Sequence, residues 1–123
     1  MSMSLRIELF VDDLDVFVDF YTRVLAFQLA DDRRDTEWPY VAVARDGVRI
    51  GAVRAGKDVD RAARMVPTGT EIVLEVDDVA AEYARVVALG HPLVGGGLQQ
   101  RAWGLTDFRL HDPDGYYLRV TDR

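Results

Sequence analysis

The chain contains no cysteine, which excludes a disulfide framework, a thiolate metal site and a cysteine nucleophile. It also lacks an N-terminal basic segment followed by an apolar stretch, and its longest apolar runs are only as long as a β-strand. This pattern predicts neither a signal peptide nor a membrane-spanning helix. We therefore expect a cytoplasmic protein.

Residues that usually carry catalysis are scarce as well. No serine follows Ser4, no Gly-x-Ser-x-Gly motif occurs, and no glycine-rich phosphate loop precedes a predicted helix. The two histidines, His91 and His111, flank loops and fit surface positions. A carboxylate could act as a general base without a metal, but no second residue is evident as its acid or orienting partner. The candidates for that base are Glu8, Glu71 and Glu75.

Composition limits the choice of partners. The 123 residues include 49% hydrophobic side chains, enough for the core of one compact domain. The net charge of -6 argues against nucleic acid as a partner. An acidic surface favours a cationic ligand, but it also serves solubility, and charge alone does not separate these readings.

The first half of the chain alternates between strand and helix patterns. Residues 5–11 alternate apolar and polar side chains, which predicts a half-buried strand. Asp12 and Asp13 follow as N-cap carboxylates, and apolar residues then recur at helical spacing to about Ala26. Two strands are predicted at 38–44 and 48–54, joined by a tight Asp-Gly turn.

The second half repeats this order. Residues 70–76 alternate, Asp77 and Asp78 precede a second helix, and Gly90 stands where a C-cap glycine belongs. A glycine-rich loop at 95–97 leads to strands near 105–110 and 116–120, which an Asp-Pro-Asp-Gly turn joins. The strand-to-helix junctions Val11-Asp12-Asp13-Leu14 and Val76-Asp77-Asp78-Val79 indicate a duplicated module.

The fold class that follows is α+β, with two tandem βαβββ modules forming a cupped mixed β-sheet. The modules are expected at about 1–56 and 68–123, within one domain spanning 1–123. The segment between them, 55–69, is polar and punctuated by glycine and proline, which is typical of a connection. In each module, one face of the sheet is expected to pack against its helix, and the other to contribute to a ligand-sized concave surface.

These motifs resemble the vicinal oxygen chelate superfamily, which includes glyoxalase I, bleomycin-resistance proteins and extradiol dioxygenases. The resemblance covers nearly the whole chain. Its motifs are the strand and junction at 9–14, the Phe-Tyr-containing helix at 20–25, the junction at 75–79, Trp103-Gly104 and the segment 111–116. It implies the glyoxalase/bleomycin-resistance fold.

The resemblance also implies four metal-ligand positions on cup-facing strands, where metal-dependent members carry His, Gln or Glu. Here those positions fall on Arg6, Gly51, Glu71 and Arg119. A guanidinium has no lone pair to donate and repels a divalent cation, so only Glu71 could bind one. We expect no metal and no other cofactor. The charged residues here are interpreted either as an ion-pair network or as ligand contacts: Arg6, Glu8, Glu71 and Arg119.

Aromatic residues are the remaining distinctive feature. Trp38 and Tyr40 are predicted to begin one strand and Trp103 another, while alternation is taken to point Phe10, Phe108 and Tyr117 into the cup. Such side chains wall a flat ligand well, although packing or a dimer interface would also explain each of them. Gln99, Gln100 and Arg101 could donate hydrogen bonds at the rim.

The sequence thus predicts a metal-independent protein that binds, and sequesters, a planar or aromatic compound such as an antibiotic, with no catalytic residues. The resemblance implies a homodimer, because drug-sequestering members hold their ligands in grooves shared by two subunits. The partners expected are a small molecule and a second copy, with no nucleic acid and no membrane. Two alternatives remain: an enzyme of the same fold, with glyoxalase, lyase, isomerase or dioxygenase activity, and a regulatory partner with a vestigial cup.

Overall fold

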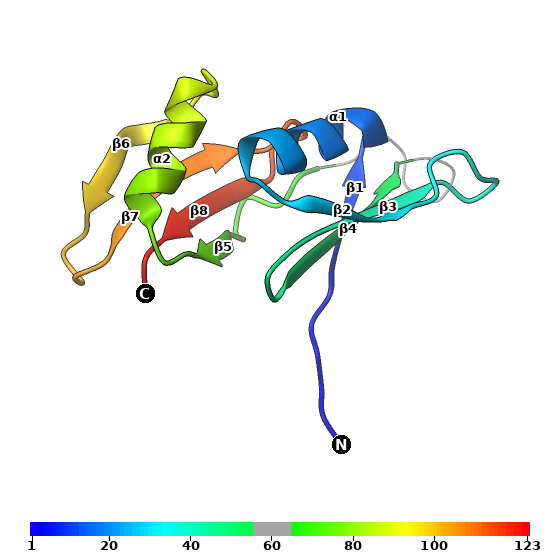
Figure 1. Cartoon of the computed structure of the whole chain (residues 1–123), viewed down its shortest axis with the longest axis horizontal. Coiled ribbons are helices and arrows are strands. Elements are labelled where there is room, and N and C mark those ends of the chain that lie inside the picture. Colours follow the sequence, from blue (N-terminus) through cyan, green and yellow to red (C-terminus); the bar gives the residue numbers. More distant parts are fainter. Residues whose placement is uncertain (56–64) are drawn as a thin grey trace. The chain divides into compact units, whose positions relative to one another are not determined.

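A computed structural model describes residues 1–55 and 65–123 of the chain. It divides into two compact units, Met1–Met65 and Val66–Arg123, each with one helical segment and one four-stranded mixed sheet (Figure 1). The predicted α+β class with two βαβββ modules is confirmed. No helix in the described ranges is long and apolar enough to cross a membrane.

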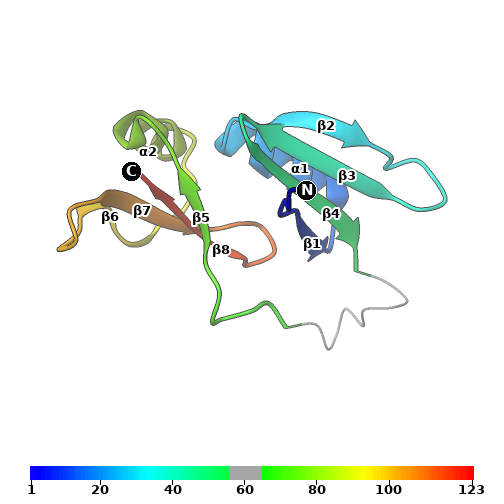
Figure 2. The ribbon, with the colours of Figure 1, turned by 90° about the horizontal axis from the view of Figure 1, so that it is seen from below.

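The first module is built on a sheet with the strand order β1-β4-β3-β2. Strand β1 runs parallel to β4, and the other neighbours are antiparallel. Figure 2 shows β2, β3 and β4 side by side, and α1 packs against β3 and β4. The elements are β1 (Ile7–Val11), α1 (Leu14–Asp19), the π-helical turn η1 (Phe20–Val24), β2 (Gln28–Asp32), β3 (Tyr40–Arg45) and β4 (Val48–Arg54).

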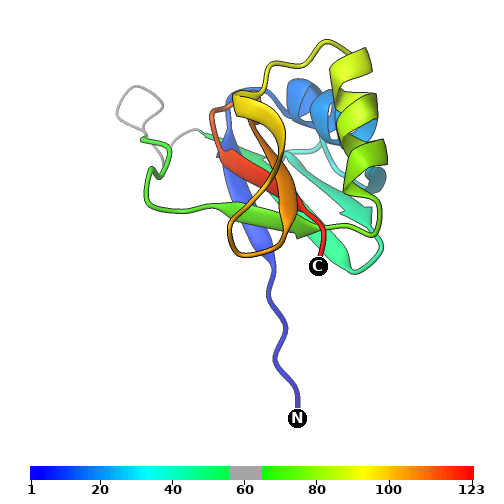
Figure 3. The ribbon, with the colours of Figure 1, turned by 90° about the vertical axis from the view of Figure 1, so that its left-hand side faces the viewer.

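The second module repeats this topology with the strand order β5-β8-β7-β6. Its helix α2 packs on β7 and β8, and lies along one side of these strands in Figure 3. The rings of Tyr83 on α2 and Phe108 on β7 meet edge to face with centroids 5.5 Å apart. The elements are β5 (Ile72–Glu75), α2 (Val79–Ala88), β6 (Val94–Gln100), β7 (Thr106–His111) and β8 (Tyr117–Thr121).

Both helices begin at the predicted junctions. In each Asp-Asp pair, the second aspartate is the N-cap: the Asp13 carboxylate accepts from the Asp15 amide at 2.8 Å, and that of Asp78 from the Ala81 amide at 3.0 Å. These bonds satisfy amides that have no partner within the helix. Gly90 follows α2 with φ +74°, as predicted for a C-cap glycine.

The first helix differs from the single amphipathic helix predicted to Ala26. After Asp19 it widens into η1, where the Leu25 amide bonds to the Phe20 carbonyl five residues back. The wider turn lets two adjacent pairs of residues face the core, Phe20 with Tyr21 and Val24 with Leu25, all at most 3% exposed. The segment then leaves the helix through Ala26, at φ +59°.

Two strands were not predicted, β2 and β6. Strand β2 has the sequence QLADD and is mostly exposed, so it shows no buried face. Strand β6 contains the three glycines interpreted as a loop. The glycine at 97 has φ +81°, and a Cβ there would lie 2.9 Å from the Tyr83 hydroxyl, so this strand needs glycine to pass α2.

Candidate functional site

The helix-free face of the second sheet carries a group of five charged side chains. In β7, Phe108 and Leu110 are fully buried on the side of α2, so Asp107 and Arg109 lie on the opposite face. Cross-strand register places Arg119 of β8 directly opposite Arg109. We call the group on this face the arginine cluster: Arg101, Asp107, Arg109, Arg119 and Glu71.

Asp107 is the centre of the arginine cluster and its side chain is 0% exposed. Arg101, from the turn after β6, donates to Asp107 Oδ1 from Nε at 2.9 Å, and its Nη1 donates to Gln99 at 2.7 Å. Arg119 approaches Asp107 Oδ2 at 3.7 Å and donates to Glu71 at 2.9 Å. The buried carboxylate is therefore compensated by charge from two sides.

Arg109 is less well satisfied. Its Nε lies 3.8 Å from Asp107 Oδ1, and its one hydrogen bond to a residue in the described ranges is from Nη1 to the Tyr117 hydroxyl at 3.3 Å. The buried atoms Arg109 Nε and Asp107 Oδ2 both lack a hydrogen-bond partner within the described structure. Burial lowers the pKa of the Arg109 guanidinium, but the Tyr117 hydrogen bond and the two nearby carboxylates outweigh burial and raise it above its usual value.

The helix-free face of the first sheet carries a smaller polar group. Glu8 accepts from Arg6 at 2.7 Å and from the Tyr40 hydroxyl at 3.1 Å. Burial, and then the bond to Glu8, raises the pKa of Tyr40, while Arg49 acts in the opposite direction. A Cβ at Gly51 would lie 2.1 Å from Glu8 Oε2 and 2.4 Å from the Tyr40 hydroxyl. Glycine at this position makes room for both side chains.

The ion pairs considered from the sequence exist within each module. Arg6 pairs with Glu8 in the first, and Glu71 pairs with Arg119 in the second, across 48 residues of chain. The histidines take no part in either pair: His91 Nε2 hydrogen-bonds to the backbone carbonyl of His111 at 2.9 Å.

The four positions matched to metal ligands do not fit a divalent cation. Arg6 and Arg119 are cationic, Gly51 has no side chain, and Glu8 covers that glycine with a carboxylate already bound by Arg6. The one carboxylate of the set, Glu71, is held by Arg119. Over residues 1–55 and 65–123, no group of three or more His, Asp or Glu side chains could hold a metal ion. No chemistry through a metal follows from these residues.

The predicted aromatic wall is only partly on the helix-free faces. Phe10 is 44% exposed there, and Tyr117 lies on the same face as Arg109. Trp38 and Trp103 are 81% and 60% exposed, but they lie in turns before β3 and β7 instead of starting those strands.

The placement predicted for Phe108 is wrong, because it is fully buried against Tyr83 of α2. Gln100 pairs with Thr106, whose alternation places it on the helix side, whereas Gln99 pairs with Asp107 and shares the cluster's face. The sequence interpretation also missed Asp107 and Arg109. The signal was available, since they alternate with the apolar residues Phe108 and Leu110.

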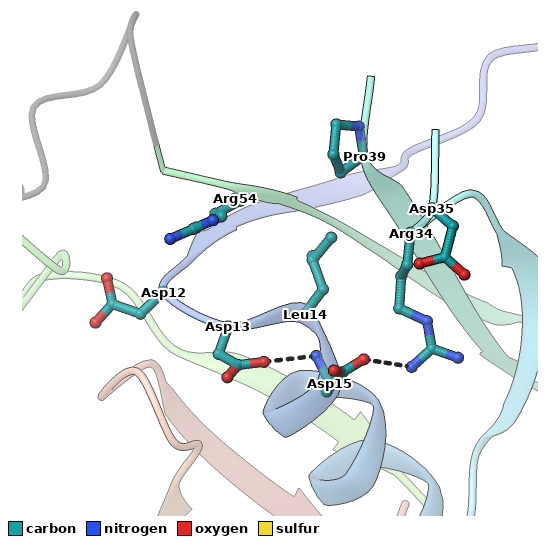
Figure 4. A pocket seen from close by; sticks show the side chains of 8 residues that line it. All are labelled: Asp12, Asp13, Leu14, Asp15, Arg34, Asp35, Pro39 and Arg54. Carbon is teal, nitrogen blue, oxygen red and sulfur yellow. Dashed lines mark hydrogen bonds and ion pairs between the residues drawn. The ribbon is translucent and has the colours of Figure 1, made fainter. Parts of the chain in front are cut away.

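A pocket of about 310 Å³ lies at the start of α1, where β1 and β4 end (Figure 4). Asp13 caps the helix there, and Arg34 bridges Asp15 at 2.9 Å to Asp32 at 2.8 Å. The hydrogen bonds that the Arg34 side chain and backbone amide donate to Asp32 lower the pKa of that carboxyl to about 2. The ion pair between Arg34 and Asp15 links the segment between β2 and β3 to the first turn of α1. None of the predicted ligand-binding residues lines the pocket.

Comparison with known proteins gives the family. Residues 4–120 match the model of the Glyoxalase/Bleomycin resistance protein/Dioxygenase superfamily. The chain belongs to this superfamily. The resemblance drawn from the sequence is thus confirmed at that level. No curated protein matches the chain.

Several solved structures share the fold over nearly all of their length. UcmS2 is 23% identical and superposes with a TM-score of 0.82 over 100% of both chains. TioX from Micromonospora sp. ML1 is 23% identical, with a TM-score of 0.78 over 98% of each chain. Lactoylglutathione lyase from Agrobacterium tumefaciens is 18% identical, with a TM-score of 0.74 over 99% of this chain and 94% of that one. At these identities the likeness establishes the fold alone.

Proposed function

We propose that this superfamily member is a metal-independent binding protein that sequesters a planar or aromatic small molecule. The observation that carries the proposal is the chemistry of the metal-ligand positions. Guanidinium groups occupy two of them and glycine a third, and none of these can coordinate a cation. A binding role needs no coordinated metal.

The ion pairs support this reading. A catalytic carboxylate must be available to a substrate or a metal, but Glu71 is bound by Arg119 and Glu8 by both Arg6 and Tyr40. Bound in this way, the carboxylates order the polar face of each sheet. They serve recognition better than proton transfer.

Exposed aromatic side chains supply the ligand contact in this proposal. Trp38 and Trp103 stand in turns with most of their surface accessible, and Phe10 is 44% exposed on the helix-free face of β1. Tryptophan is among the residues that are enriched where binding energy is concentrated. Flat rings gain contact area and offset stacking on such residues. By resemblance to the drug-sequestering members, the ligand class includes aromatic antibiotics and the working unit is a homodimer.

Tryptophan fluorescence tests the proposal directly. We expect planar aromatic compounds from a screening panel to quench the emission, and Trp38→Ala or Trp103→Ala to weaken binding by about tenfold or more, the usual effect of truncating a central aromatic contact. Each tryptophan variant serves as the control for the other, because the chain has two tryptophans. Unchanged affinity in both variants would refute the aromatic wall.

Metal analysis separates binding from the enzymatic alternative. The purified protein should contain no stoichiometric Zn, Ni, Fe or Mn, and a chelator should leave ligand affinity unchanged. Mass spectrometry of the recovered ligand should show an unaltered compound. A stoichiometric metal, or a converted ligand, would instead support a glyoxalase- or dioxygenase-type enzyme.

A further inference from the structure

We infer that the helix-free face of the second module binds an acidic group, so that the ligand of the proposed function is an aromatic carboxylate. The inference rests on that proposed function and names its ligand class. Its basis is the arginine cluster, in which three guanidiniums meet two carboxylates. This concentration of positive charge lies in a chain whose net charge is -6.

Arg109 is the arginine of this cluster with the most unused hydrogen-bond donors. Arg101 is used by Asp107 and Gln99, and Arg119 by Glu71. Among residues 1–55 and 65–123, Arg109 makes a single hydrogen bond, at 3.3 Å, to a neutral hydroxyl, and its Nε has no hydrogen-bond partner. A guanidinium carries five N–H donors, so most of those of Arg109 are unused.

The register of the sheet places Arg109 beside a second arginine. Arg109 and Arg119 are directly opposite on β7 and β8, and like charges in that arrangement repel each other. Asp107 is buried beside them but leaves Oδ2 without a hydrogen bond. An incoming carboxylate would balance the one positive charge by which the three arginines of the cluster exceed its two carboxylates, and it would accept two parallel hydrogen bonds from one guanidinium.

The group is also accessible. The Arg109 side chain is 27% exposed, so part of it faces solvent, while its Nε is buried. Partial burial strengthens a charge-assisted hydrogen bond because solvent screens it less. Glu75, at the end of β5, makes no ion pair with the three arginines in the described ranges.

A matched pair of probes tests the inference on the intact protein. We would titrate the ¹⁵N-labelled chain with 2-naphthoate and with its neutral analogue 2-naphthamide, following the Arg109 Nε–H signal and tryptophan emission together. Naphthoate should shift the Arg109 signal saturably and bind at least about tenfold more tightly than naphthamide, the size of one charge-assisted hydrogen bond. Equal affinities, or no saturable Arg109 shift up to 10 mM naphthoate (about the weakest binding of interest), would overturn the inference.

Charge variants give the second arm. Arg109→Gln should reduce naphthoate affinity about tenfold and leave naphthamide affinity unchanged, whereas Glu71→Gln, which frees Arg119, should increase naphthoate affinity. Arg23→Gln, which removes the same charge from an exposed pair with Asp19 on the first helix, is the control and should change neither. If Glu71→Gln weakened naphthoate binding, the arginines would not be the anion-binding groups.

The two proposals fail separately. If naphthamide and other neutral aromatics quench tryptophan emission but naphthoate gains nothing from its charge, the proposed function stands and the acidic ligand class is wrong. If acetate alone shifts the Arg109 signal while no aromatic compound quenches tryptophan, the anion site stands and the aromatic wall is wrong.

Discussion

Gly51 offers a quantitative test of how tightly the polar group of the first module is packed. A Cβ added there would lie 2.1 Å from Glu8 Oε2, which is closer than any normal contact, so the Glu8 carboxylate must move by more than an ångström. That movement breaks the 3.1 Å bond from Tyr40 and disturbs the 2.7 Å pair with Arg6.

The magnitude follows from these contacts. A hydrogen bond to a partly exposed carboxylate stabilises by about 1 kcal/mol, and an exposed ion pair by about 0.5 kcal/mol. Replacing glycine by alanine in a strand recovers about 0.5 kcal/mol. Gly51→Ala should therefore lower the free energy of unfolding by about 1 kcal/mol. In a Glu8→Ala background, where the Tyr40 hydroxyl is no longer held in place, it should be neutral or slightly stabilising.

Urea denaturation of the unmodified protein, Gly51→Ala, Glu8→Ala and the double variant measures the coupling energy between positions 51 and 8, which we expect at about 1.5 kcal/mol. Gly47→Ala is the matched control, because a Cβ at that turn glycine meets nothing within 4 Å. An equal cost of Gly51→Ala in both backgrounds would show that Glu8 does not occupy the space above β4.

Three further outcomes are expected. Asp107→Asn should destabilise the protein by about 3 kcal/mol in urea denaturation, because it removes the buried carboxylate that compensates several arginines. Phe108→Ala should cost about 3–5 kcal/mol and the exposed Phe10→Ala much less, by the same assay; equal costs would contradict the core position of Phe108. Arg34→Gln should raise the pKa of Asp32 from about 2 toward 3.8 in an NMR titration. Because the pKa of Asp32 is lowered in the folded state, the ionised Asp32 stabilises the fold above pH 3.8, and this stabilisation is lost as the pH falls toward 2. Arg34→Gln should therefore be less stable than the unmodified protein above pH 3.8 and should approach its stability near pH 2.

The sequence predicted those elements whose buried face is regular. Alternation identified β1 and β5, and β-rich stretches joined by turn signals identified β3, β4, β7 and β8, all to within about two residues. The Asp-Asp junctions marked both helix starts. It missed β2 because acidic residues dominate that strand, and β6 because its glycines read as a loop. In both, pairing with the neighbouring strand determines the structure more than local preference does.

The site was harder to predict than the fold. Alternation assigns Phe108 and Arg109 to opposite faces, but it does not say which face the helix covers. Leu110, fully buried on the same side as Phe108, settles that choice only once the packing of α2 is known. The contact of Arg101 with Asp107 depends on the turn after β6, whose path no periodicity encodes.

Each sheet has two edge strands, and in one of them, β2 or β6, the pairing register shifts, between Leu29 and Asp31 in β2 and between Val94 and Gln99 in β6. A straight, exposed strand edge is a template on which another chain can add a strand and begin to aggregate, and bulges interrupt that template. The register shifts in β2 and β6 are therefore expected to make these edges poorer templates for strand addition. Deleting one glycine of β6 to make its pairing with β7 regular would be expected to lower the solubility of the protein.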